Sequence, residues 1–116
     1  MKKKIVYFGY ISFSREQVDK AKQRMAERPR DYLYPIFDPT RMSQDGPASP
    51  YPCFSFSVIF DSDDIDETVA EIGTLISSLP FDSAVLVVDD EVLGLRKVYR
   101  MNASTPNFTL DISRAV

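Results

Sequence analysis

Histidine is absent from this chain of 116 residues, and cysteine occurs once. Without histidine there is no Ser-His-Asp or Cys-His machinery, no imidazole base and no histidine metal ligand. A single cysteine excludes a disulfide framework and a cysteine-based zinc site, and it suits a reducing compartment. No glycine loop can cradle a phosphate, because the four glycines stand apart, at Gly9, Gly46, Gly73 and Gly94. We therefore expect a protein that is not an enzyme and that needs no cofactor and no metal ion.

Long hydrophobic runs are also absent, since no stretch approaches the ~18 apolar residues of a transmembrane helix. Three lysines precede the apolar residues 5–11, but this stretch is short and rich in tyrosine, and no small-residue cleavage site of a signal peptide follows it. We therefore predict a cytoplasmic protein without membrane contact. The length fits one domain, residues 1–116, which can bury a core without a metal or disulfide.

Two segments have the apolar spacing of amphipathic helices. The first follows Ser14, which forms a capping box with Gln17, and it ends at Pro29, because the residue before a proline avoids the α region. The second follows Asp64, whose carboxylate can cap the amide of Glu67, and it stops at Pro80. The expected apolar faces consist of Val18, Ala21, Met25 and Ala26 in the first helix and of Ile65, Val69, Ile72, Leu75, Ile76 and Leu79 in the second.

Six segments are predicted to be strands. Residues 4–11 are β-branched and aromatic without regular alternation, which favours a strand buried on both faces. Residues 32–37 contain Pro35, which lacks the N–H of a ladder and therefore belongs at a sheet edge. Residues 53–60 alternate, and one face carries Phe54, Phe56, Val58 and Phe60. The remaining strands are 83–88, 96–102 and 107–112, and residues 38–52 form a Pro-rich loop.

The order of these elements is β-α-β-β-α-β with a β extension. It predicts an α+β fold, a ferredoxin-like two-layer sandwich with both helices on one sheet face and a C-terminal β extension. The second strand lies at an edge in that topology, which agrees with the position of Pro35. The main alternative omits the strand at 32–37 and gives a small βαβαβ sheet. Residues 31–52 would then be one long connection, which the usual loop lengths disfavour.

Charge is distributed unevenly along the chain. Residues 1–30 hold nine Lys or Arg and three Asp or Glu, whereas residues 61–91 hold ten Asp or Glu and no cation. Like charges at one helix end repel one another, so folding gains little from such an excess. A solvated face that keeps the domain soluble is one explanation. The other is a surface that steers a basic partner, because a field of one sign raises association rates and rejects wrong partners.

The acidic segment fits neither a calcium loop nor a catalytic carboxylate pair. An EF-hand loop needs glycine at its sixth position and glutamate at its twelfth, and counting from Asp61 these are Asp66 and Ile72. Nothing in the sequence suggests a cleft around the carboxylates, and a helix N-terminus stabilises their ionised form.

An RNA-binding sheet is one alternative, because aromatic side chains on such sheets stack on bases. Residues 54–56 and Tyr7 or Tyr10 fit that idea, and the helix within residues 15–30 is basic. Residues 52–53 are Pro-Cys where a basic residue and a glycine are expected, and a net charge of -3 opposes phosphate binding. A second alternative is a homo-oligomer with paired sheet edges and a small-ligand pocket between its subunits.

The sequence therefore favours a small acidic binding protein, an inhibitor or immunity-type protein that occludes the basic site of a toxin, nuclease or nucleic-acid-processing complex. Its carboxylates would replace the phosphates of the true substrate, and aromatic side chains around the long loop would anchor the contact. The predicted partner-binding residues are the acidic Asp61, Asp63, Asp64, Asp66, Glu67, Glu71, Asp89, Asp90 and Glu91 and the aromatic Tyr32, Tyr34, Phe37 and Tyr51.

Overall fold

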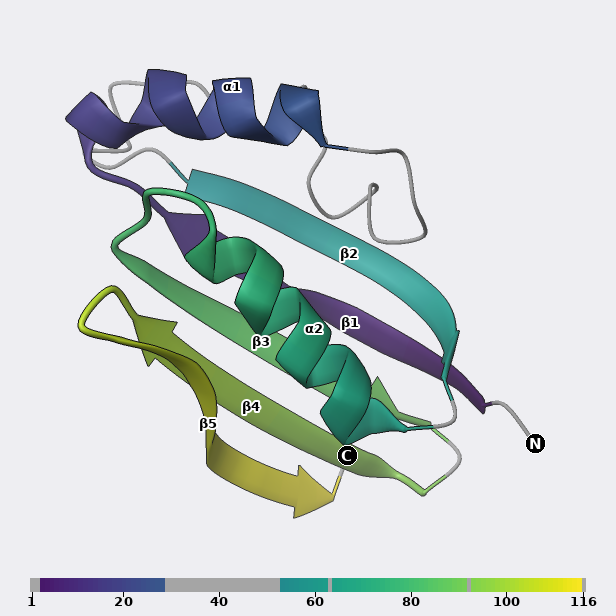
Figure 1. Ribbon diagram of the computed structural model, residues 1–116. Helices are drawn as coiled ribbons and strands as arrows, with labels where there is room; N and C mark the ends of the chain where they lie inside the picture. Colours follow the sequence, from purple (N-terminus) through teal and green to yellow (C-terminus); the bar gives the residue numbers. More distant parts are fainter. Residues whose placement is uncertain (1–2, 29–52, 63, 92, 116) are drawn as a thin grey trace.

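The computed structural model describes residues 3–28, 53–62, 64–91 and 93–115 (Figure 1). These residues form one sheet and two α-helices, an α+β fold as the sequence predicts. The element order is β1 (Lys3–Ser12), a 3₁₀ turn η1 (Arg15–Gln17), α1 (Val18–Glu27), β2 (Cys53–Ser62), α2 (Ile65–Ser77), β3 (Ser83–Asp90), β4 (Leu95–Asn102) and β5 (Thr105–Ala115).

The five strands form an antiparallel sheet in the order β2-β1-β3-β4-β5. The ferredoxin-like sandwich is not confirmed, because this order differs from it. Two consecutive hairpins place β4 beside β3 and β5 beside β4, so β3 lies inside the sheet, whereas the ferredoxin-like order would leave it at an edge. The predicted strand at 32–37 and the predicted loop at 38–52 lie outside the described residues.

The helix boundaries follow the local capping signals. Gln17 Oε1 accepts a hydrogen bond of 2.8 Å from the Ser14 amide, and Asp64 Oδ1 accepts one of 3.1 Å from the Glu67 amide. Each bond satisfies a backbone N–H that has no partner within its own helix. Arg28, the residue before Pro29, is extended, with φ -67° and ψ 144°, as the steric effect of a following proline requires.

α2 lies across one face of the sheet, and α1 lies beside the β2 edge (Figure 1). Their apolar residues join one core with the sheet, in which Ala21, Met25, Ile72 and Ile76 are fully buried. Ala26, predicted on the apolar face of the first helix, is exposed instead.

β1 shows that the helices cover one face of the sheet. Ile5, Tyr7 and Ile11 are fully buried on the helix side, whereas Phe8 is half-buried and Tyr10 is 42% exposed on the opposite side. The prediction that this strand is buried on both faces is therefore wrong. Its residue types suit burial on either side, but the described helices supply cover on one side only.

Candidate protein-binding site

The sheet topology brings two separate acidic stretches together. β2 and β3 both run antiparallel to β1, so the last residues of both strands lie at the same end of the sheet, next to the first residues of β1. In the register of β1, Lys4 is opposite Asp61 of β2, and Val6 is opposite Asp89 of β3. α2 begins shortly after β2, and its first turn starts at that side as well. Residues 64–71 and 89–91 therefore lie toward the same end of the sheet.

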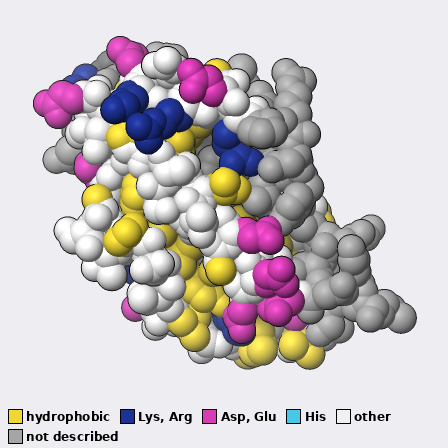
Figure 2. Space-filling model, viewed as in Figure 1, with side chains coloured by type: hydrophobic (Ala, Val, Ile, Leu, Met, Phe, Trp, Pro, Cys, Tyr) yellow, Lys and Arg dark blue, Asp and Glu magenta, His cyan; other side chains and the backbone are white. Residues whose placement is uncertain are grey.

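The first turns of α2 supply four carboxylates to this end. Asp64 is the N-cap, Asp66 and Glu67 follow in the first turn, and Glu71 lies one turn beyond Glu67. All four side chains are exposed. The positive end of the helix dipole stabilises carboxylates here, and Asp64 adds the capping bond to the helix backbone. Figure 2 shows acidic side chains gathered where α2 begins.

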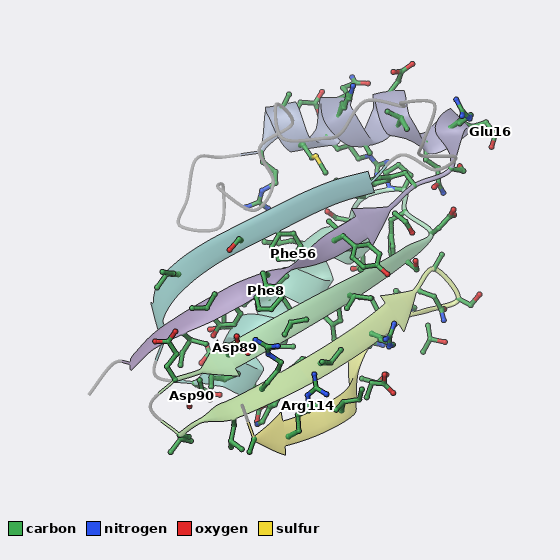
Figure 3. The ribbon with its side chains drawn as sticks, turned by 180° about the vertical axis from the view of Figure 1, so that it is seen from behind. Phe8, Glu16, Phe56, Asp89, Asp90 and Arg114 are labelled. Carbon is green, nitrogen blue, oxygen red and sulfur yellow. The ribbon has the colours of Figure 1, made fainter. Side chains whose placement is uncertain are left out.

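Three consecutive acids with different roles lie at the end of β3 and in the turn after it, and Figure 3 labels the first two, Asp89 and Asp90. Asp89 forms a bidentate pair with Arg96, with distances of 2.6 and 2.7 Å, and this hydrogen bond and charge raise the pKa of the Arg96 guanidinium. Asp90 is buried, and its Oδ1 accepts a hydrogen bond of 3.1 Å from the Leu93 amide in the turn to β4. Glu91 is exposed. Of these three predicted binding residues, Glu91 is the one whose carboxylate faces solvent without such a structural role.

We use the name acidic end for the exposed carboxylates that these two stretches bring together. It consists of Asp64, Asp66, Glu67, Glu71 and Glu91. The other predicted partner-binding residues either form hydrogen bonds within the fold, as Asp89 and Asp90 do, or lie outside the described residues. The side chains of Asp61 and Asp63 and all of Tyr32, Tyr34, Phe37 and Tyr51 lie outside the described part of the chain.

A hollow of about 310 Å³ adjoins the acidic end between α2, β4 and β5. Asp66 lines it together with the rings of Tyr99 and Phe108, which meet edge to face with centroids 6.4 Å apart. Gly73 leaves room for Phe108, since a Cβ on this glycine would lie 3.0 Å from the ring. Burial first, and then the negative charge of Asp66, raise the pKa of Tyr99.

This hollow has the chemistry to hold a long basic side chain. The aliphatic stem of a lysine or arginine can lie against aromatic and apolar walls while its charged head meets a carboxylate. Tyr99 and Phe108 were not among the residues predicted from sequence. Their place beside Asp66 depends on the packing of β5 against α2, which no local pattern encodes.

The basic helix lies at the other end of α2. Arg24 Nη1 donates a hydrogen bond to the carbonyl oxygen of Ser78, the C-cap of α2, where the helix dipole is negative. Arg24 thus contributes to the fold, although the nucleic-acid alternative used it for phosphate binding. Of the aromatic residues of that alternative, Tyr7 and Phe56 are buried under the helices and Tyr10 is exposed, whereas the side chain of Phe54 lies outside the described part of the chain.

Two further properties bear on the kind of site. Within the described ranges, no three Cys, Asp or Glu side chains are grouped so that they could hold a metal ion. Neither described helix has the length and hydropathy needed to cross a bilayer.

No family model, no curated protein and no solved structure matches this chain.

Proposed function

We propose that this protein binds a basic protein partner through the acidic end and acts by occlusion rather than by catalysis. The observation that supports the proposal is that the start of α2 and the β3–β4 turn lie at the same end of the sheet and that both carry exposed carboxylates. A field of one sign concentrated at one end accelerates encounter with an oppositely charged surface.

The proposed partner is a toxin, nuclease or nucleic-acid-processing protein with a cationic groove. Such grooves are basic because neutralising phosphates dominates their affinity for nucleic acid. The carboxylates of the acidic end occupy the positions of those phosphates and exclude the substrate. The protein would then be an inhibitor or immunity-type protein, as its sequence predicts.

The hollow beside Asp66 gives the contact a specific anchor. In the proposed complex, one lysine or arginine of the partner enters between α2 and β5 and places its charge at the Asp66 carboxylate. The rings of Tyr99 and Phe108 then contact its stem. A buried, paired charge of this kind affects mainly the dissociation rate, whereas the exposed Glu67 and Glu91 affect mainly the association rate.

The test compares two triple charge reversals with the same change in net charge. One variant reverses the acidic end, Asp66→Lys, Glu67→Lys and Glu91→Lys. The control reverses three exposed acids in and around α1, Glu16→Lys, Asp19→Lys and Glu27→Lys. The wild-type chain serves as bait in an extract of cells that encode this protein, and a basic nuclease recovered with it is identified by mass spectrometry. This nuclease, once purified, is the probe. Affinity and nuclease inhibition are measured for each variant, and circular dichroism confirms that both are folded.

We expect the acidic-end variant to lose at least about a hundredfold in affinity and to stop inhibiting, because close charge pairs at such interfaces are strongly coupled. The control should bind within about threefold of wild type, and wild-type binding should weaken steeply as salt rises. Equal losses in both variants would mean that net charge alone is responsible. Unchanged affinity in the acidic-end variant would reject the proposal.

A further inference from the structure

The face of the sheet opposite α2 is apolar and exposed. Ile59 of β2 is 64% exposed, and Tyr10 of β1 and Ile112 of β5 are each 42% exposed. Phe8, Val87 and Val98 lie half-buried between them. No element of the described chain packs on this side, which Figure 3 views directly, with Phe8 near its centre. We call this surface the open face.

The strand register places these side chains in one continuous belt. Phe8 is opposite Val87, Val87 is opposite Val98, and Val98 is opposite Ile112, so a single row of apolar residues crosses four strands. Their sequence neighbours Tyr7, Leu86 and Tyr99 are buried beneath the helices, which fixes the belt on the opposite side. Ile59 extends the belt to the β2 edge.

Most charges around the belt are paired within the chain, and Arg114, which is exposed and opposite Arg96 in the register, adds one further cation. Asp89 binds Arg96, whose guanidinium also lies 5.6 Å from the centroid of the Phe8 ring. Arg100 binds Asp111 at 2.7 Å. A strongly basic or acidic macromolecule would find little opposite charge to bind here. A second copy of this surface, with its two ion pairs and one further cation, would meet limited like-charge repulsion, so the charge pattern is compatible with self-association.

The size of the open face also suits a dimer. Five strands spaced about 4.8 Å apart, each with about eight residues of about 3.3 Å, give a footprint near 600 Å² on each copy, or about 1,200 Å² in total. Stable interfaces begin at about this size. Two such faces can pack as aligned sheets about 10 Å apart, in the way that β-sandwich cores pack.

We propose that two copies of this chain associate face to face through the open face. The contact is isologous, so each residue of the belt occurs twice in the interface. It differs from a pairing of sheet edges, because the contacts are made by side chains rather than by backbone hydrogen bonds. The acidic end of each copy lies at the helix side of the sheet and at one end of it, so both copies can display it. The inference does not depend on the proposed function.

The experiment is sedimentation of the full chain over a range of concentrations, at low and high salt. The test variant is Ile59→Lys with Ile112→Lys, two exposed positions at opposite rims of the belt. The matched control is Leu93→Lys with Leu110→Lys, which are 59% and 52% exposed. Leu93 lies in the β3–β4 turn, and Leu110 is opposite the buried Tyr99, so both lie off the open face. The two double variants change the net charge equally.

We expect wild type and control to sediment with twice the mass of the chain, and the dimer to persist at high salt because its contact is apolar. The test variant should raise the dimer dissociation constant by at least about tenfold, since it places four unpaired charges, two from each copy, against the apolar belt of the other copy. A wild-type chain that stays monomeric at all concentrations would overturn the proposal. So would a dimer that both double variants weaken equally.

Discussion

Both faces of β3 carry aliphatic side chains, but the helices cover only one of these faces. Leu86 points toward α2 and is fully buried, whereas its neighbour Val87 points away from the helices and is only half-buried. Both are aliphatic, as are most residues of this strand. The comparison teaches that the apolar content of a strand does not tell which of its faces the same chain will cover.

The two faces are also stabilised differently. The helix-covered face consists of large apolar side chains, and in the described core the one buried charged side chain is Asp90. The open face combines a narrower apolar belt with the ion pairs Asp89–Arg96 and Arg100–Asp111. Burial therefore dominates on one side, and paired charges keep the other side compatible with water.

Truncation of neighbouring residues on β3 gives the largest expected contrast. Leu86→Ala should lower the free energy of unfolding by about 2–5 kcal/mol, because it leaves a cavity in a fully buried core. Val87→Ala should cost about 1 kcal/mol or less in dilute protein, where its face meets solvent. Urea unfolding of the two variants and of wild type measures both values. Equal losses at low concentration would contradict the difference in cover.

The two ion pairs of the open face should differ in strength. In the Asp89–Arg96 pair the side chains are 16% and 33% exposed, against 46% and 56% for Asp111 and Arg100. Solvent weakens exposed pairs, so a double-mutant cycle with Asp89→Asn and Arg96→Gln should give the larger coupling. The cycle with Arg100→Gln and Asp111→Asn should give a coupling within experimental error. The reverse order would show that exposure does not control these pairs.

Tyr99 gives the smallest effect, confined to alkaline pH. Its raised pKa means that the folded protein retains the phenolic proton to a higher pH than the unfolded chain does. Stability should therefore fall as the pH rises above about 10, the usual tyrosine value, because the unfolded state then gains from ionisation. Tyr99→Phe should flatten this decline, whereas Tyr10→Phe, on the open face, serves as the control. Identical slopes for wild type and Tyr99→Phe would contradict the role of burial.

Local signals in the sequence predict the elements well. The caps at Ser14 and Asp64, the extended residue before Pro29 and the alternation at Phe56 and Ile59 all involve neighbours within a few residues. The acidic composition of residues 61–91 is likewise visible without a structure.

The strand order and the burial of individual side chains could not be predicted from these local signals. The order of strands depends on which hairpin edge pairs with β3, and the exposure of Tyr10 depends on where the helices lie. The acids of residues 89–91 also differ in role, which their sequence does not indicate. Asp89 and Asp90 form hydrogen bonds within the fold, with Arg96 and with the Leu93 amide, whereas Glu91 is exposed. Sequence composition counts all three alike.

The place of β1 between β2 and β3 has a consequence for synthesis on the ribosome. Ser12, at the end of β1, pairs with Cys53 and Ser83, so β1 emerges from the ribosome before either of the strands that flank it in the sheet. Translation adds about 5–20 residues each second, which leaves this apolar segment without its sheet partners for seconds. The lysines that precede residue 5 place charge beside it during that interval, and flanking charges of this kind slow aggregation of a nascent chain.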